Sequence, residues 1–114
     1  MVVLDEGIEK IAEIIEPELT QGQWGTGTTS PTETDTGLET PVAATKLTTT
    51  STLSGTTIEQ THTLPSTAAN GNTLTEFSSL FSDDTNLDRT VGGGISKTAS
   101  IEVITISQFN IIRG

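Results

Sequence analysis

The chain lacks most of the residue types on which catalytic and metal sites depend. Among its 114 residues there is no cysteine and only one histidine, His62. The absence of cysteine excludes disulfide bonds, thiolate metal sites and cysteine nucleophiles, and a single histidine leaves little for zinc binding or histidine-based catalysis. We therefore expect a protein that is not an enzyme, with no catalytic residues, no bound metal and no cofactor.

Basic residues and long apolar segments are also scarce. Five lysine and arginine residues stand against fifteen aspartate and glutamate residues, which gives a net charge of −10. Such a chain repels a phosphate backbone, so we expect no nucleic-acid partner. No apolar run approaches the ~20 residues that span a bilayer, and the start, Met1–Glu6, lacks the basic region of a signal peptide. The sequence thus predicts no membrane insertion and synthesis in the cytoplasm.

Threonine takes the place of the missing apolar residues. It accounts for 24 of the 114 positions, whereas hydrophobic residues make up 32%, below the roughly 45–50% of a typical globular domain. Threonine is β-branched and favours a half-buried, pleated surface. The composition therefore predicts a mainly β protein.

The first part of the chain, 1–20, has the pattern of an amphipathic helix. Leu4, Ile8, Ile11 and Ile15 recur at spacings that place them on one helix face. Pro17 ends the pattern because it cannot donate a backbone hydrogen bond. A helix of about three turns is marginal alone, so we predict that this segment docks on its own domain or on neighbouring copies.

The rest of the chain divides into a loop region, 21–41, and a β-domain, 42–114. Glycines and a proline break 21–41, where we predict one short strand near Gln23–Gly25 with Trp24 packed at the core edge. From residue 42 the pattern alternates with period two. The predicted strands are 45–53, 57–64, 73–81, 87–91 and a last one from 101 to 109 or 112, with a bulge or hinge at Gly92–Gly94. This pattern is typical of an antiparallel β-sandwich of about five to seven strands with one N-terminal α-helix.

Four groups of residues raise the question of a chemical site. Asp84, Asn86 and Asp88 match the first alternating ligands of a calcium loop, but Arg89 and Ile95 occupy positions where that loop needs glycine and glutamate. We interpret this segment as a solvated turn.

The remaining candidates are weaker. The glycine-rich segment 22–29 lacks the lysine of a phosphate-binding loop. His62 has no partner at a spacing that suggests a triad, and we interpret it as a surface or core-edge residue. Glu59 and Glu76 could act as paired carboxylates, but nothing distinguishes them from the other acidic residues, so we interpret them as part of a solvated face.

Three short segments resemble structural proteins of tailed bacteriophages and tailed archaeal viruses. Residues 24–38, WGTGTTSPTETDTGL, are similar to a recurring "GTGTTAP…DTxL" segment of these proteins. Residues 69–81 resemble their "NGxLTEFGLF" strand, with Ser78-Ser79 in place of the usual glycine, and residues 94–98 resemble their "xxIxKT" approach to the last strand. The order of these segments agrees over nearly the whole chain.

The resemblance implies a small virion component, made in the host cytoplasm, that forms a symmetric oligomer within the tail or fibre attachment apparatus. Its partners would be further copies, other virion proteins and a glycan or protein of the host surface. Two alternatives stay open: a capsid decoration or turret subunit, and a carbohydrate- or cell-surface-binding β-module. The second would need an aromatic platform or a calcium site.

We predict two sets of surface residues for such a protein. The first set would make assembly contacts and comprises Leu4, Ile8, Ile11, Ile15 and Trp24. The second set would form outward-facing loop tips and comprises Asn70, Gly71, Asp83, Asp84 and Asn86. Removal of residues 1–19 is expected to abolish assembly and leave the β-domain folded.

Overall fold

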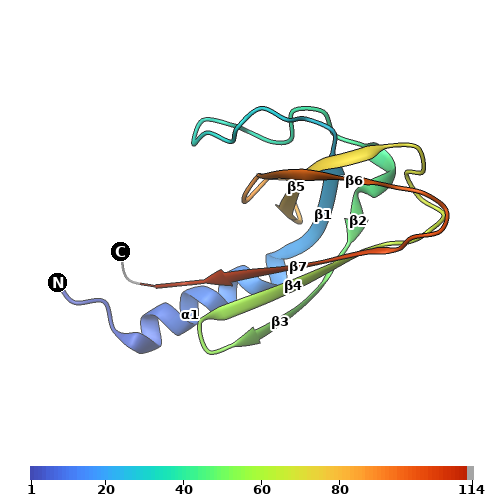
Figure 1. The fold of residues 1–114 in the computed structure, drawn as a ribbon. Helices are drawn as coiled ribbons and strands as arrows, with labels where there is room; N and C mark the ends of the chain where they lie inside the picture. The colour runs from blue at the N-terminus through green and yellow to red at the C-terminus, as the bar shows by residue number, and fades with distance from the viewer. Residues whose placement is uncertain (113–114) are drawn as a thin grey trace.

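The computed structural model describes residues 1–112, which form one α-helix and seven β-strands in two antiparallel sheets (Figure 1). The elements are α1 (Asp5–Ile15), β1 (Leu19–Gly25), β2 (Leu47–Thr48), β3 (Thr50–Ser54), β4 (Thr57–Leu64), β5 (Thr73–Phe81), β6 (Thr90–Ser96) and β7 (Val103–Asn110). Sheet A has the order β2-β1-β5-β6 and sheet B the order β3-β4-β7. The predicted fold class, a mainly β sandwich with an N-terminal helix, is confirmed.

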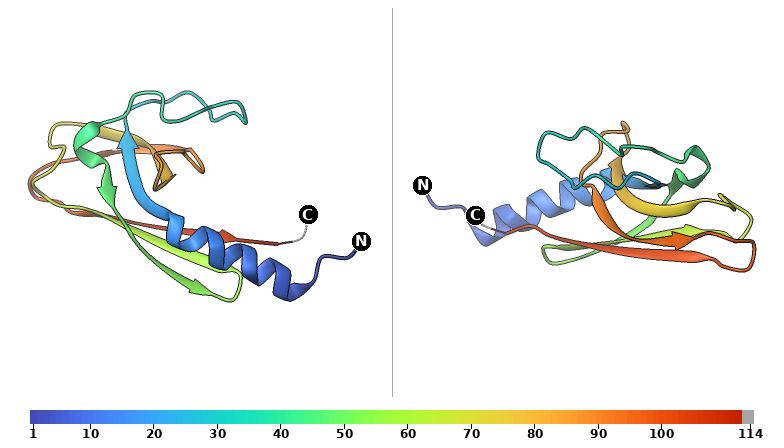
Figure 2. Two further views of the ribbon diagram at one scale, coloured as in Figure 1. Left: turned by 180° about the vertical axis from the view of Figure 1, so that it is seen from behind. Right: turned by 45° about the horizontal axis from the view of Figure 1, so that its top comes forward.

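Helix α1 and strand β1 follow one another along the same face of sheet B (Figure 2). Asp5 and Glu6 lie in the first turn of α1, where carboxylates interact favourably with the helix dipole. The helix tightens into a 3₁₀ turn at Glu16–Glu18, because Pro17 lacks the backbone N–H that another α-turn would require. Both sheets and the helix thus share one core.

Aromatic rings join the two sheets at the centre of the molecule. Phe77 of β5 packs edge-on against Trp24 of β1 and His62 of β4, with ring centroids 5.1 and 5.3 Å apart. Gly22 lets the rings approach, since a Cβ there would lie 2.8 Å from both His62 and Phe77. The buried apolar core comprises Ala12, Leu19, Ile58, Leu64, Leu74, Phe77 and Leu80.

The structure corrects the predicted strands in the first half of the chain. β1 begins at Leu19 and is a central strand of sheet A, so the sandwich is not confined to 42–114. Within 21–41 this strand covers residues 21–25, and the rest is loop, as predicted. The predicted strand 45–53 is two strands. The chain leaves sheet A after β2 and enters sheet B at β3, and between them the Thr49 amide donates to the Thr20 carbonyl at 2.9 Å.

The predicted return strand 87–91 is also wrong, because β6 spans Thr90–Ser96 and contains the three glycines. Val91 of β6 pairs with Glu76 of β5, and Ile95 pairs with Leu74. The chain therefore advances by four residues on β6 where it advances by only two on β5. The two extra residues form the bulge that the glycines permit, and Gly94 has a φ of +33°. The hairpin between β3 and β4 and the strand 73–81 are confirmed.

Candidate functional site: polar clamps and an apolar surface

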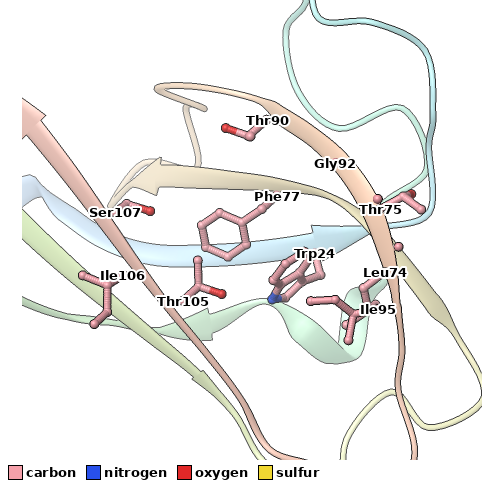
Figure 3. A pocket seen from close by; sticks show the side chains of 12 residues that line it. Trp24, Leu74, Thr75, Phe77, Thr90, Gly92, Ile95, Thr105, Ile106 and Ser107 are labelled. Carbon is pink, nitrogen blue, oxygen red and sulfur yellow. The ribbon is translucent and has the colours of Figure 1, made fainter.

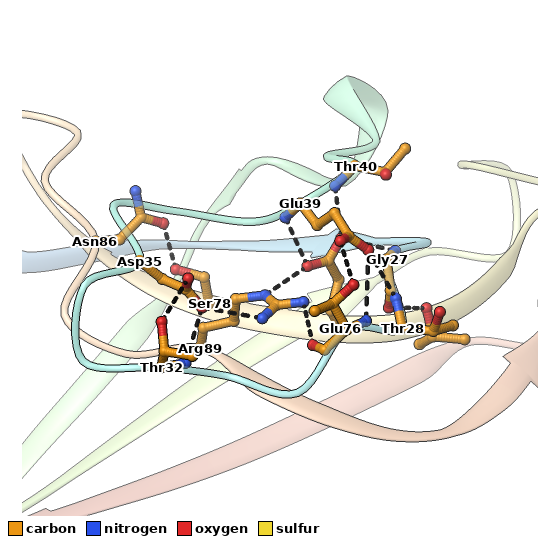
Figure 4. A network of polar contacts seen from close by, with 12 residues as sticks. Gly27, Thr28, Thr32, Asp35, Glu39, Thr40, Glu76, Ser78, Asn86 and Arg89 are labelled. Atoms are coloured by element: carbon orange, nitrogen blue, oxygen red, sulfur yellow. Dashed lines mark hydrogen bonds and ion pairs between the residues drawn. The ribbon is translucent and has the colours of Figure 1, made fainter.

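Glu76 is a fully buried carboxylate at the centre of a network that holds the 26–40 loop onto sheet A (Figure 4). Its oxygens accept hydrogen bonds from the backbone amides of Gly27, Glu39 and Thr40, each at 2.8 Å. They also accept one from Arg89 Nε at 2.9 Å. Burying a charge is costly unless hydrogen bonds and an opposite charge compensate for it, and here four donors do so. We call this network the Glu76 clamp.

The glycines of the loop segment make the Glu76 clamp possible. A Cβ at Gly25 or Gly27 would lie 2.5 Å from Glu76 Oε2. At Gly25 it would also lie 2.6 Å from the carbonyl oxygen of Thr40. Only glycine lets the backbone approach the carboxylate so closely, so the Gly-Thr-Gly segment is explained by packing around Glu76.

Arg89 extends the clamp to the far side of the loop. Its side chain is 6% exposed, and its terminal nitrogens donate to Asp35 Oδ2 at 3.1 Å and to the Thr29 carbonyl at 2.8 Å. The hydrogen bond to Glu76 holds the pKa of Arg89 above its usual range. Burial alone would raise the pKa of Glu76, but its bonds to Arg89 and the backbone amides outweigh burial and leave that pKa below its usual value.

The Glu76 clamp is not arranged for acid–base chemistry. All the contacts above join Glu76 to the chain itself, and a general acid or base must instead reach the proton of a substrate. The interpretation of Glu76 as part of a solvated face is wrong, because the alternation of β5 did not show which face the loop covers. Glu59 is half-buried and accepts a hydrogen bond from Gln108 at 3.1 Å.

Lys97 forms a second clamp beside the start of β5. This lysine is almost fully buried, and its Nζ donates to Ser66 O at 3.1 Å, Asn70 Oδ1 at 2.8 Å and Thr98 O at 3.0 Å. Backbone hydrogen bonds from Gly71 to Lys97 and from Lys97 to Asn72 reinforce it. The Lys97 clamp ties the β4–β5 connection to the segment after β6, and the sequence pattern did not indicate it.

The two clamps bring together the segments that carry the resemblance. The Glu76 clamp joins 24–38 to the Thr-Glu-Phe strand, and the Lys97 clamp joins Asn70-Gly71 to Lys97-Thr98. These residues therefore hold loops in place.

His62 is buried against Gly22 and Phe77, and its Nε2 lies 2.8 Å from the Thr45 carbonyl. A carbonyl can only accept, so Nε2 carries the proton. Burial lowers the pKa of His62. His62 is thus a core residue that bridges the two sheets.

The calcium-loop candidates bind separate partners. Asp84 contacts Lys46 Nζ at 2.8 Å and Gln21 Nε2 at 2.9 Å, whereas Asp88 accepts from the Ser79 amide at 2.8 Å. Asn86 is bonded to Ser78 and to the Thr36 carbonyl. Within residues 1–112 no group of three or more histidine and acidic side chains is placed to hold a metal ion.

The glycine-rich segment 22–29 offers no free phosphate cradle. The Gly27 amide donates to Glu76, and the Thr28 amide donates to Glu39 at 3.1 Å. Carboxylates therefore occupy the amides that a phosphate would use.

Helix α1 has a wider apolar face than its own domain covers. Ala12 is buried and Ile8 and Ile15 are half-buried, so this inner row contacts the domain. An outer row remains exposed and comprises Leu4 (67% exposed), Ile11 (44%) and Ile14 (60%). The four predicted assembly residues at the helix are thus divided between the two rows, Trp24 lies apart from them on β1, and Ile14 was missed. At 100° per residue the outer row occupies the adjacent part of the same apolar arc.

The expected effect of removing residues 1–19 needs correction. The deletion would take away Ala12 and Leu19, which are both core residues of the domain.

The predicted loop tips lie before and after β5. Asn70, Gly71, Asp83 and Asp84 are exposed, and Asn86 is half-buried. The turn at Asp83 borders a groove beside Ile14 of α1.

Trp24 is half-buried and contacts Phe77, with its indole lining a cavity between the sheets rather than forming an exposed platform. This arrangement does not favour the carbohydrate-binding alternative.

Comparisons of the chain with protein-family models, with curated proteins and with solved structures found no match. No helix in residues 1–112 has the length and apolar character needed to cross a membrane.

Proposed function

We propose that the chain is a non-enzymatic structural subunit of a tailed virus, which assembles into a symmetric oligomer within the tail or fibre attachment apparatus. The observation that carries the proposal is the outer row of α1, Leu4, Ile11 and Ile14, which is apolar and exposed. Exposed apolar surface of this kind marks a protein contact. A subunit that meets its neighbours through this row buries it.

The clamps support a structural role. The interior charges of Glu76, Arg89 and Lys97 bind loop backbone. They fix loops that would otherwise move, and a fixed surface lowers the entropic cost of assembly. The viral context rests on the resemblance, whose segments are the ones that these clamps join.

The solution mass of the protein, measured by light scattering, tests the assembly. We expect an oligomer of defined mass, and a double change of Ile11→Gln with Ile14→Gln should lower that mass. The matched control is Glu6→Gln with Glu13→Gln, on the polar side of the same helix. All four residues are exposed, so each variant should retain the wild-type circular dichroism spectrum.

A wild-type monomer at both low and molar salt would refute the assembly. The viral role is tested separately, by immunogold electron microscopy of particles of the virus that encodes the chain. Gold confined to the tail supports the proposal. Gold on the head would instead support the alternative of a capsid decoration or turret subunit, and unlabelled particles would refute a virion role.

A further inference from the structure

The two sheets end in four edge strands, and the longest of them has none of the features that normally protect an edge. An edge strand exposes unpaired backbone N–H and C=O groups, and proteins protect it by shortness, charge, proline or a bulge. β2 has two residues, β3 has five, and β6 contains the glycine bulge. β7 has eight residues, pairs with β4 without a bulge, and contains neither charge nor proline.

The first half of the outer face of β7 is also apolar, whereas Gln108 and Asn110 continue that face. Ile104 is 57% exposed and Ile106 is 60% exposed. Within residues 1–112 no strand pairs with the second edge of β7. The backbone groups on that edge are left to water unless another strand pairs with them.

We propose that β7 pairs antiparallel with β7 of a second copy, with Thr105 on the two-fold axis. The proposal rests on the oligomeric function above and names one of its contacts. It joins the two copies of sheet B into a continuous six-stranded sheet with the order β3-β4-β7-β7-β4-β3. Such a contact is isologous, because each copy offers the same strand to the other.

The sequence around Thr105 is self-complementary in this register. Ile104 faces Ile106 of the second copy, and Thr105 faces Thr105. Both pairings are among the cross-strand contacts that stabilise sheets. In this register the numbers of two paired residues add up to 210, so both are even or both are odd. Because side chains alternate between the two faces of a strand, each pair joins side chains on the same face of the sheet.

Charge limits where two copies of the chain can meet. Each copy carries −10, so a close contact between copies requires an uncharged surface, and β7 provides one. In the proposed register the nearest charge, Glu102, faces Gln108 of the second copy. Gln108 is an uncharged amide that donates to the Glu59 carboxylate of its own chain at 3.1 Å. Like charges therefore do not lie directly opposite each other, although Glu59 lies next to the pair.

A cavity along the same side of the sandwich gives a second reason for a covering strand. It has a volume of about 330 Å³ and lies between the two edge strands β6 and β7. Figure 3 shows Thr105 and Ile106 of β7 on one side of it, and Trp24, Phe77 and Ile95 on the other. A strand added to β7 extends sheet B past the mouth of this cavity.

Cysteine cross-linking tests the register directly, since the chain contains no cysteine of its own. Thr105→Cys would place two thiols opposite each other on the axis. The matched control is Thr52→Cys, the same exchange on β3 at the opposite edge of sheet B. We expect mild oxidation to give a disulfide-linked dimer with Thr105→Cys and only monomer with Thr52→Cys. Equal amounts of dimer from the two variants would overturn the proposal.

A second variant tests the surface without a cross-link. Ile104→Lys with Ile106→Lys places like charges opposite each other in the proposed register, so the dissociation constant of the contact should rise by about tenfold or more. Both isoleucines are exposed, so the fold should survive. Loss of the β7 contact in this variant supports the proposal, and an unchanged mass overturns it.

The same measurements separate this inference from the proposed function. If the wild-type protein is an oligomer and neither β7 experiment changes as expected, the β7 contact is wrong and assembly through α1 stands. If the wild-type protein is a monomer at every concentration and salt, both proposals fail.

Discussion

At the scale of single residues, the buried charges of this protein serve the fold. Glu76 and Lys97 are both excluded from solvent, and each has its hydrogen bonds directed at the chain itself. Removing one partner of such a group leaves an unsatisfied atom, which costs more than the bond contributes. The stability of the loops should therefore depend on a few residues that no catalytic argument would select.

Gly27 is one of these residues. In Gly27→Ala the new Cβ would lie 2.5 Å from Glu76 Oε2, and we expect a loss of about 1–3 kcal/mol of unfolding free energy from overpacking. The matched control is Gly7→Ala on α1, where a Cβ meets nothing within 4 Å. Alanine favours a helix, so the control should gain up to about 1 kcal/mol. Urea denaturation measures both, and equal effects would contradict the role given to the Glu76 clamp.

His62 should make stability depend on pH. Burial lowers its pKa in the folded state, so below about pH 6.5 the unfolded chain binds a proton that the folded chain does not. The contribution of His62 is thus fully present above pH 6.5 and is lost as the pH falls towards the lowered pKa. Urea midpoints at pH 7.5 and 5.5 should differ in the wild type and agree more closely in His62→Gln. An equal difference in both proteins would show that another group causes it.

At the scale of elements, the sequence predicted those strands well whose position depends only on the alternation of apolar and polar residues. Strand 73–81 and the β3–β4 hairpin follow the period-two pattern and are confirmed. The alternating pattern did not predict the start of β6 correctly, because side-chain hydrogen bonds replace backbone pairing before it. Asp88 accepts a hydrogen bond from the Ser79 amide, and Arg89 donates to Glu76. Periodicity carries no information on such long-range bonds.

The helix shows a similar limit. Its apolar spacing predicted a docking face, but the division into an inner row at Ala12 and an outer row at Ile14 depends on how α1 lies on sheet B. Only the three-dimensional arrangement shows which apolar residues remain exposed. The sequence therefore predicted that α1 has an apolar docking face, but it identified only some of the residues that remain exposed on that face.

The Lys97 clamp allows a prediction for the β4–β5 connection. Lys97→Met keeps the apolar stem but removes three hydrogen bonds, which leaves acceptors such as Ser66 O without their donor. We expect a loss of about 2 kcal/mol or more and faster hydrogen exchange at the Gly71 amide. Lys10→Met on the exposed face of α1 is the matched control and should change neither. Unchanged exchange at Gly71 would show that backbone bonds alone hold this connection.

At the scale of the whole molecule, charge and apolar surface oppose each other. Each copy carries −10, and α1, whose outer row is proposed to meet a neighbour, has four acidic residues and one lysine. Copies therefore repel at long range, although the surfaces that would join them are apolar or uncharged. Salt shortens the range of this repulsion from about 10 Å at 0.1 M to about 3 Å at 1 M, and it leaves apolar burial in place.

The two proposed contacts should consequently strengthen as salt is added. We expect the average mass from light scattering to rise between 0.05 and 1 M sodium chloride, an interval of roughly tenfold or more in ionic strength over which the Debye length falls severalfold. Glu6→Gln with Glu13→Gln should reach a given mass at lower salt, because it removes two like charges from each copy without changing the outer row of α1. A mass that falls as salt is added would mean that ion pairs hold the copies together, and neither the outer row of α1 nor β7 could then be the main contact.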